Sequence, residues 1–236
     1  LVSHFTQTFA QPIYQWRGPN RDGQYNETGL LNKWPENRPQ LLRSFSELGA
    51  GYSAPVVTPD KIYVNGVSGE QSHLFCFDLN GKLLWKSPNG QEFTGEGYSA
   101  NFPGARPSPT VVGDKVYTSS GLGRIGCFDA ATGKELWAVD MHTGFGGFLN
   151  QFGYAESFVT DEKLLYCFPG GTTNNVMALD RMTGKTIWTS KAVGDTTHFC
   201  SPILVNHNGT KMLVSVSRHY VFGVDAKTGG LLWKYP

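Results

Sequence analysis

The chain has 236 residues, of which 13% are aromatic and 29 are glycine, and its 20 Lys and Arg residues nearly balance 19 Asp and Glu for a formal net charge of +1. This balance provides no excess of positive charge for neutralising phosphates, so the sequence predicts no nucleic-acid partner. No window approaches 18 consecutive apolar residues, so the sequence also predicts no transmembrane helix.

Residues 1–40 are predicted to form an N-terminal leader followed by an irregular segment. Residues 1–11 resemble the end of a secretory signal peptide, because small residues (Thr8 and Ala10) stand at the −3 and −1 positions of a cut after Ala10. The alternative is a frayed leader. We favour export, which predicts a periplasmic or secreted (extracellular) protein.

The segment from Gln15 to Gly23 is rich in turn-forming residues and is expected to cross the surface and seat Trp16. Residues 41–46 begin Leu-Leu-Arg-Ser-Phe, which resembles the Leu-Leu-Trp-Lys runs at 83 and 231. This likeness predicts a lone outer strand at residues 41–46.

An eleven-residue motif, Ala-Leu-Asp-Arg-Met-Thr-Gly-Lys-Thr-Ile-Trp at 178–188, organises the rest of the chain. Similar copies lie at 127–137 and 223–233, and a copy one residue shorter lies at 76–85. The aspartates of the four copies are 51, 51 and 45 residues apart. A period of about 40–50 residues indicates a repeat architecture.

Each copy ends a unit of four predicted strands, which are runs of β-branched and aromatic residues bounded by Gly, Asp and Asn. Four short antiparallel strands per repeat are typical of a β-propeller blade. The fold class is therefore all-β, a β-propeller of four-stranded antiparallel blades. The predicted blades cover about 52–88, 106–140, 154–190 and 199–236.

The residue types of the motif fit a tight turn followed by an outer strand. Aspartate and threonine side chains accept hydrogen bonds from turn amides, and glycine supplies a positive φ. The tryptophan at the end of the outer strand is expected to dock against the next blade, where its burial would contribute a gross ~4–6 kcal/mol. The predicted docking residues are Trp85, Trp137, Trp188 and Trp233.

The predicted strand at residues 41–46 is one too many for a closed ring of four blades. Propellers commonly close when one terminus donates a strand to the blade formed by the other. We therefore expect the chain to supply about half of a ring of seven or eight blades, with the remainder coming from further sequence or from a partner chain.

Two of the four cysteines, Cys76 and Cys127, occupy the same repeat slot, where the other copies have Ala178 and Gly223. This pattern indicates small buried thiols rather than a disulfide framework, and the same interpretation extends to Cys167 and Cys200. The histidines lack metal-ligand spacing, so no metal site is predicted.

The motif Ala-X-Asp-X-X-Thr-Gly-Lys-X-X-Trp resembles the repeat of the PQQ-like, or quinoprotein-like and BamB-like, β-propellers. The segments Trp16–Gly23, Gly51–Ser53 and Gly153–Ser157 add a resemblance to bacterial PQQ-binding-like repeat proteins. The resemblance covers nearly the whole chain and implies the fold. It leaves the activity open, because the superfamily contains quinoprotein alcohol dehydrogenases and also BamB-type scaffolds that bind no cofactor.

The resemblance to the dehydrogenases implies an adjacent Cys-Cys disulfide over the quinone, and calcium held by Glu and Asn near a catalytic Asp. No two cysteines are neighbours here, and no such ligand set can be placed on the sequence. We therefore expect no cofactor, with PQQ and calcium as the alternative.

Loops that lead into the innermost strands of a propeller surround the mouth of the central channel. The candidate ligand-binding residues on them are Tyr52, Arg106, Tyr154, Glu156 and His198. Arg106 and Glu156 begin adjacent blades. They either hold a polar ligand, with Glu156 as partner or base, or form a structural ion pair. The catalytic residues are left unknown.

Two long inserts, 92–106 and 143–153, are rich in glycine and aromatic residues. They either contact a partner or pack on their own blades. The function predicted from the sequence is that of an exported binding or scaffold module with a protein, small-molecule or glycan ligand at the channel face. The alternative is a PQQ-dependent alcohol or sugar dehydrogenase. A polysaccharide hydrolase or lyase would need a carboxylate pair, for which Glu156 alone is too little.

Overall fold

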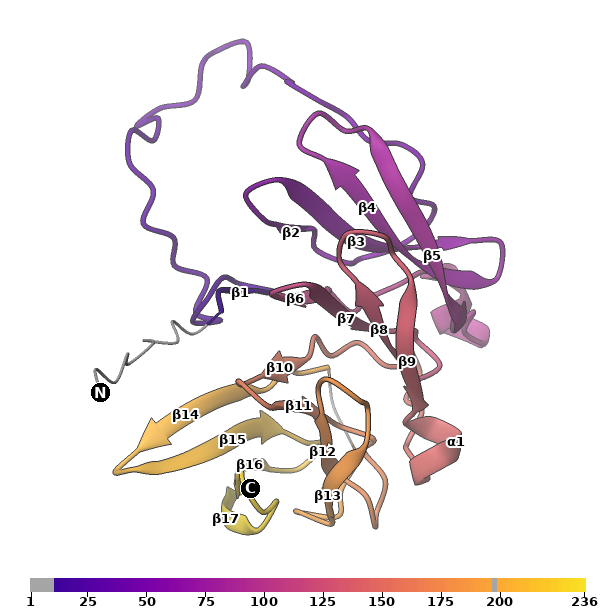
Figure 1. Cartoon of the computed structure of the whole chain (residues 1–236), viewed down its shortest axis with the longest axis vertical. Coiled ribbons are helices and arrows are strands. Elements are labelled where there is room, and N and C mark those ends of the chain that lie inside the picture. Colours follow the sequence, from indigo (N-terminus) through magenta and orange to yellow (C-terminus); the bar gives the residue numbers. More distant parts are fainter. Residues whose placement is uncertain (1–10, 197–198) are drawn as a thin grey trace, which may run out of the picture.

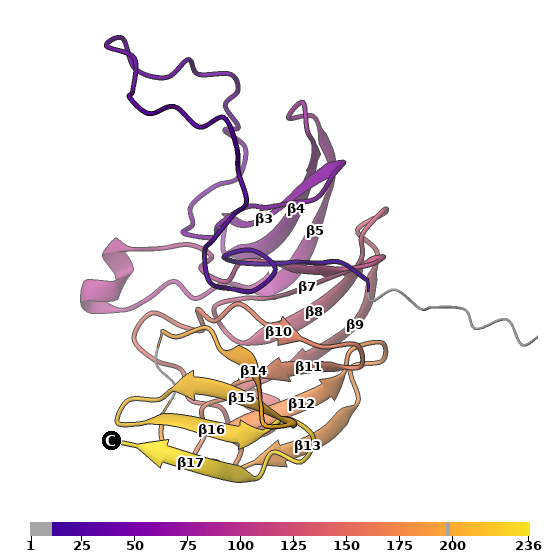
Figure 2. The same ribbon diagram turned by 90° about the vertical axis from the view of Figure 1, so that its left-hand side faces the viewer.

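The structure is a computed structural model that describes residues 11–196 and 199–236, so the expected leader at 1–10 lies outside the described residues. The described chain forms four antiparallel sheets, one after another, as predicted (Figures 1 and 2). We call them blades 1 to 4. Among the described residues, no helix is long and apolar enough to cross a membrane.

The blades share one strand order, from the innermost strand to the outermost. Blade 1 contains β2 (Val56–Val57), β3 (Lys61–Ser68), β4 (Gln71–Asp78) and β5 (Leu83–Gln91). Blade 2 contains β6 (Thr110–Val112), β7 (Lys115–Ser119), β8 (Arg124–Asp129) and β9 (Glu135–Asp140). Blade 3 contains β10 (Val159–Thr160), β11 (Leu164–Cys167), β12 (Val176–Asp180) and β13 (Thr186–Ser190). Blade 4 contains β14 (Ile203–His207), β15 (Thr210–Val216), β16 (Val221–Asp225) and β17 (Leu231–Tyr235).

The repeated motif forms the turn between the third and fourth strands of each blade. In blade 3, Asp180 Oδ1 accepts hydrogen bonds from the N–H groups of Met182 (3.0 Å) and Thr183 (2.8 Å) and from the Thr183 hydroxyl (2.9 Å). Gly184 follows with φ of 72°, a conformation that favours glycine. Blades 2 and 4 repeat the same three contacts from Asp129 and Asp225.

The outer-strand tryptophans reach the glycine of this turn in the following blade. The Nε1 of Trp137 donates to the Arg181 carbonyl (3.2 Å), and a Cβ on Gly184 would stand 2.7 Å from the Trp137 ring. Trp188 makes the same contacts with Ala226 (3.3 Å) and Gly229 of blade 4. The glycine is therefore required twice, for its positive φ and for the close approach of the ring. Trp85 lies against Gly133, whereas Trp233 of blade 4 is 39% exposed.

The hydrophobic core lies between the blades. One cluster joins blades 1 and 2 through residues such as Val56 and Phe128, a second joins blades 2 and 3, and a third joins blades 3 and 4. The second cluster includes Cys127 and Cys167, both fully buried free thiols. Each blade is thus stabilised chiefly by its neighbour.

A series of serine hydroxyls also links the blades just before their innermost strands. Ser108 Oγ accepts the N–H of Ala54 (3.0 Å), Ser157 Oγ accepts the N–H of Ser108 (2.9 Å), and Ser201 Oγ accepts the N–H of Ser157 (3.0 Å). We call this series the serine ladder. It joins all four blades beside their innermost strands.

The N-terminal segment adds a short strand, β1 (Ile13–Tyr14), to the inner edge of blade 2, where it pairs with β6. The buried Arg21 then donates to the carbonyls of Ser157 (2.9 Å) and Phe158 (2.8 Å) in blade 3 and also contacts the ring of Trp16. Burial lowers the pKa of Arg21 to about 10. Beyond Arg21, the chain arches away from the blades at the top of Figure 1.

The strand expected at residues 41–46 is not formed. Within this segment Phe45 contacts a face of blade 1, and the backbone just after it meets β3. Phe45 contacts Phe77 with ring centroids 5.5 Å apart, and the Leu48 carbonyl accepts the N–H of Val67 (3.2 Å).

Candidate binding site

The segments that lead into blades 1 to 4 converge on one concave surface, which we call the aromatic cradle. It has a volume of about 460 Å³ and is lined by Tyr52, Tyr98, Phe102, Arg106, Phe152, Ala155 and Phe199. Tyr52 precedes blade 1, and the other residues come from the three connections between successive blades. The cradle therefore forms only when all four blades pack side by side.

Local backbone structure presents the aromatic residues. Tyr98 lies in the short 3-10 helix η1 (Gly97–Asn101), the magenta coil that projects at the left of Figure 2. Ser99 Oγ accepts the N–H of Glu96 (3.0 Å) and so closes the turn that carries Tyr98. In the next insert, Asn150 Oδ1 accepts the N–H of Phe152 (3.0 Å). The second insert also contains α1 (His142–Phe145).

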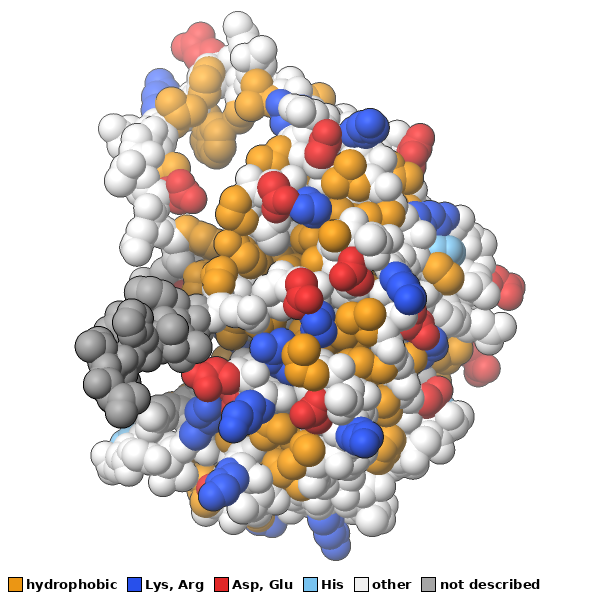
Figure 3. Space-filling model, in the orientation of Figure 1, with side chains coloured by type: hydrophobic (Ala, Val, Ile, Leu, Met, Phe, Trp, Pro, Cys, Tyr) orange, Lys and Arg blue, Asp and Glu red, His pale blue; other side chains and the backbone are white. Residues whose placement is uncertain are grey.

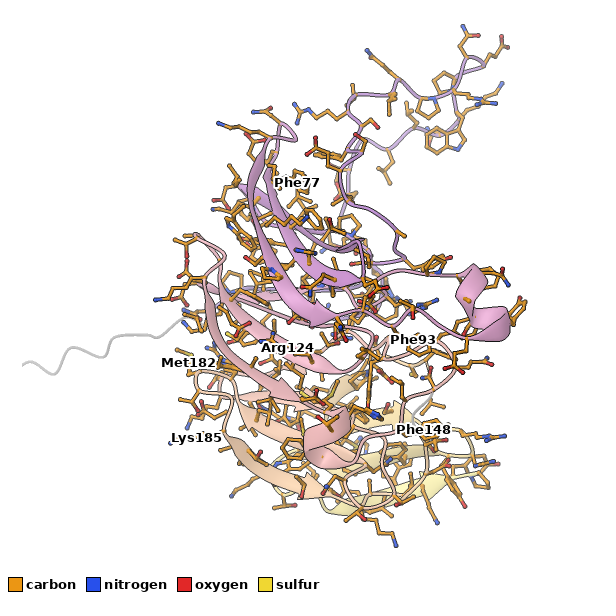
Figure 4. All side chains as sticks on the ribbon, turned by 90° about the vertical axis from the view of Figure 1, so that its right-hand side faces the viewer. Phe77, Phe93, Arg124, Phe148, Met182 and Lys185 are labelled. Atoms are coloured by element: carbon orange, nitrogen blue, oxygen red, sulfur yellow. The ribbon has the colours of Figure 1, made fainter. Side chains whose placement is uncertain are left out.

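Glycine allows the segments that carry Tyr52 and Arg106 to approach one another. Gly104 has φ of 115°, and a Cβ there would lie 2.5 Å from the Ala50 carbonyl. The N–H of Tyr52 donates to the Ala105 carbonyl (2.7 Å), which joins the two segments. Figure 4 shows Phe93, at the base of one insert, and Phe148, in the other, on the same side of the molecule.

The aromatic rings form a connected group. Ring centroids are 5.2 Å apart for Tyr98 and Phe102, 6.2 Å for Phe102 and Phe152, and 5.6 Å for Phe152 and Phe199. Tyr98 is nevertheless 71% exposed, and Tyr52 is 59% exposed. The rings therefore support one another while leaving a large apolar surface open to solvent.

Arg106 is the charged group of the cradle. Its Cζ lies 5.1 Å from the ring centroid of Tyr52 and 5.2 Å from that of Phe152, within the range of cation–π attraction. The guanidinium donates to the carbonyls of Gly104 (3.1 Å) and Phe102 (2.6 Å), which fixes its position. Partial burial lowers the pKa of Arg106, and Tyr52 and Glu92 counteract this effect.

The ion pair expected between Arg106 and Glu156 is absent from the described residues. Glu156 is buried, and its carboxylate accepts the N–H of Ala155 (3.3 Å), the residue that lines the cradle in its place. Burial raises the pKa of Glu156 to about 7. Tyr154 is also in the core, where its hydroxyl donates to the Pro169 carbonyl (3.0 Å).

Of the five residues predicted to bind a ligand, the structure thus brings Tyr52 and Arg106 together in the cradle and places Tyr154 and Glu156 behind it. His198 lies outside the described residues. The sequence prediction also missed the buried Glu92, whose Oε1 accepts the N–H groups of Phe93 (3.0 Å) and Gly121 (2.7 Å). Glu92 stands outside the repeated motif, so no pattern marked it.

The described residues do not match the quinone and calcium site that the resemblance to dehydrogenases implies. All four cysteines are free thiols, and burial raises the pKa of Cys76 and of Cys127 to about 12. Within residues 11–196 and 199–236, no group of three or more His, Cys, Asp or Glu side chains is arranged to hold a metal. The adjacent disulfide that the resemblance implies is therefore absent from this part of the chain.

Four blades with repeated turns, and a cradle built by the loops between them, define the chain as a β-propeller repeat protein. Residues 70–236 match the family model described as outer membrane protein assembly factor BamB, and the chain belongs to this family of PQQ-like repeats.

Two curated relatives are similar to the chain. It is 24% identical to tetrathionate hydrolase of Acidithiobacillus ferrooxidans over 249 aligned positions, which cover 98% of this chain and 42% of that protein. It is 26% identical to quinohemoprotein alcohol dehydrogenase ADH IIB of Pseudomonas putida over 151 positions, which cover 57% of this chain and 20% of that protein. The chain thus spans less than half the length of either relative.

Among solved structures, the quinohemoprotein alcohol dehydrogenase of Comamonas testosteroni has the same fold, with a TM-score of 0.57 at 18% identity. The match covers 79% of this chain and 34% of that chain. At this identity the likeness concerns the fold alone.

Proposed function

We propose that the chain is an exported, periplasmic or secreted, PQQ-like β-propeller module that binds a partner in the aromatic cradle. The observation that carries this proposal is the position of Arg106 between Tyr52 and Phe152, on a largely apolar surface open to solvent. Aromatic residues and arginine are the side chains most enriched among the energetic centres of binding surfaces.

The repeated architecture supports a role in binding. The residues that recur in every blade form turns and contacts between blades, and the cradle is composed of residues that do not recur. In repeat proteins, insertions on one face commonly form the binding surface.

The test is a binding screen with three ligand classes, namely a random peptide library, acidic oligosaccharides and small ring carboxylates. We expect at least one class to bind the purified protein and to bind more weakly when Tyr98→Ala removes the most exposed ring of the cradle. If no class binds, or if Tyr98→Ala leaves all binding unchanged, the proposal is wrong.

A second candidate function is a PQQ-dependent alcohol or sugar dehydrogenase. It is favoured by the 26% identity to quinohemoprotein alcohol dehydrogenase ADH IIB. The test is dye-coupled oxidation of alcohols and sugars after addition of PQQ and Ca²⁺ to the purified protein. Turnover that requires the quinone would favour this candidate over a binding module.

A further inference from the structure

Arg106 lacks a carboxylate partner. In the described part of the chain, no Asp or Glu lies within salt-bridge distance of its guanidinium. The carboxylate that acts on its pKa is Glu92, whose Oε1 is held by two backbone amides and whose buried Oε2 has no hydrogen-bond partner among the described residues. A half-buried guanidinium with N–H groups to spare offers a carboxylate a short, charge-assisted hydrogen bond.

The rest of the cradle is apolar. Apart from Arg106 and the hydroxyls of Tyr52 and Tyr98, its described lining consists of Phe and Ala side chains. A sugar ring can stack its apolar face on an aromatic ring, but its hydroxyl groups also need hydrogen-bonding partners to replace the water that they lose. The cradle offers few such groups and instead suits an apolar side chain.

The cradle is also open. Tyr98 and Tyr52 remain mostly exposed, so a small molecule bound there would keep much of its surface in water. Sites for small ligands typically enclose 70–90% of the ligand. An open aromatic surface around one fixed arginine is typical of a site that receives side chains from a larger partner.

Resting on the proposed function, we propose that the cradle receives a polypeptide segment in which a carboxylate stands beside a large apolar side chain. The carboxylate pairs with the free N–H groups of Arg106. The apolar side chain covers Tyr98, Phe102 and Phe199 of the cradle. The volume of about 460 Å³ accommodates one or two side chains, so the cradle recognises a short motif.

The experiment is phage display of random dodecapeptides on the purified protein, followed by fluorescence anisotropy with the most enriched peptide. We expect the enriched peptides to carry Asp or Glu next to Phe, Trp, Tyr or Leu. Replacing the acid of the peptide by its amide should weaken binding at least about tenfold, as should Arg106→Gln in the protein. Tyr98→Ala should weaken binding of the acidic peptide without abolishing the preference for an acid.

Arg124→Gln is the matched control. Arg124 lies on β8 and pairs with Glu135 (2.8 Å) away from the cradle, so this variant should bind as the wild type does (Figure 4). Because Arg106 also holds the carbonyls of its own loop, Arg106→Lys provides a second variant, which keeps the charge but loses bidentate geometry and should bind with intermediate affinity.

Enrichment of peptides without an acid, or equal binding by wild type and both Arg106 variants, would overturn the inference. An acidic oligosaccharide such as trigalacturonate is the discriminating probe. If it binds through Arg106 while no peptide does, the proposed binding function stands and the polypeptide ligand is wrong. If neither of these probes binds and the small ring carboxylates do not bind either, both proposals fail.

Discussion

The two ends of the blades differ in how they use their residues. At one end, which we call the turn end, Asp129, Asp180 and Asp225 make the same three hydrogen bonds in three successive blades. At the other end, the insert end, every blade contributes a different side chain to the cradle. Figure 4 shows the contrast, with Met182 and Lys185 of one turn on one side and Phe93 and Phe148 on the other.

This difference separates stability from recognition. A hydrogen bond that is repeated from blade to blade stabilises the fold of the blades and their packing. A residue that occurs once serves a contact that the fold itself does not need. Substitutions at the turn end and between blades should therefore change stability, and substitutions in the cradle should change binding. The predictions below test this separation.

The largest effect is expected between blades. Trp137→Ala should lower the free energy of unfolding by about 3–5 kcal/mol, because it leaves a cavity over Gly184 and removes the hydrogen bond to Arg181. The measurement is denaturant unfolding. Trp233→Ala, at the exposed face of blade 4, is the matched control and should cost clearly less. Equal losses would show that the docking contact does not account for the stability.

The next effect depends on pH. The pKa of Glu156 is raised by burial from 4.5 to about 7 in the folded protein. Between these values the unfolded chain releases a proton that the folded chain keeps, so stability falls as pH rises, by up to about 3 kcal/mol in total. The cost is absent below pH 4.5 and constant above about 7.

The test of Glu156 is the Glu156→Gln variant, whose stability relative to the wild type should increase between pH 4.5 and 7 in urea melts. Contributions from other titrating groups cancel in this difference. A difference that stays constant over this range would show that Glu156 does not titrate as the geometry indicates.

A smaller effect is expected in the turns. Asp180→Ala removes three hydrogen bonds from one exposed turn and should cost about 1 kcal/mol, as the loss of a helix cap does. Lys185→Ala, in the same turn, should be close to neutral. The measurement is the melting temperature of the two variants. If Asp180→Ala melts at the wild-type temperature, the hydrogen bonds of the repeated turn do not contribute to stability.

The smallest effect on stability is expected in the cradle. Tyr98→Ala should change the free energy of unfolding by less than about 0.5 kcal/mol, because the side chain is 71% exposed. The same variant should weaken ligand binding. A large drop in melting temperature would mean that the aromatic group holds the inserts together rather than receiving a partner.

The sequence predicted the turn end well and the insert end poorly, for a physical reason. The motif recurs with a nearly constant period, so each copy supports the interpretation of the others. Asp180 Oδ1 and Thr183 Oγ1 both accept turn N–H groups and Gly184 has a positive φ, as expected. Gly184 also provides the surface against which the Trp137 ring packs, and this second role could be recognised only from the structure. It depends on how neighbouring blades stack, which the sequence of one blade does not express.

The inserts differ in length and lack a period, so their aromatic residues were recognised without any indication of which would meet. The expected pairing of Arg106 with Glu156 failed because Ala155 lines the cradle while Glu156 is buried behind it. Residues 41–46 form no strand in the described chain, but they were expected to join a blade formed by further sequence, so that expectation stays a prediction. A strand also needs a free edge beside it, and the composition of a segment carries no information on that. The expectation of a seven- or eight-bladed ring remains a proposal.

Charged groups of both signs are interspersed over the face shown in Figure 3, in keeping with the net charge of +1. Long-range attraction of a highly charged partner is therefore not expected to dominate recognition. Short-range contacts in the cradle would set the affinity.

The serine ladder makes the separation of the blades measurable one interface at a time. The amides of Ala54, Ser108 and Ser157 are each held by a hydroxyl of the following blade. Amide hydrogen exchange at Ala54 therefore reports the parting of blades 1 and 2, exchange at Ser108 that of blades 2 and 3, and exchange at Ser157 that of blades 3 and 4. Similar exchange rates at the three amides would mean that the blades separate in one cooperative step. Rates that change steadily from Ala54 to Ser157 would show at which end of the chain the separation begins.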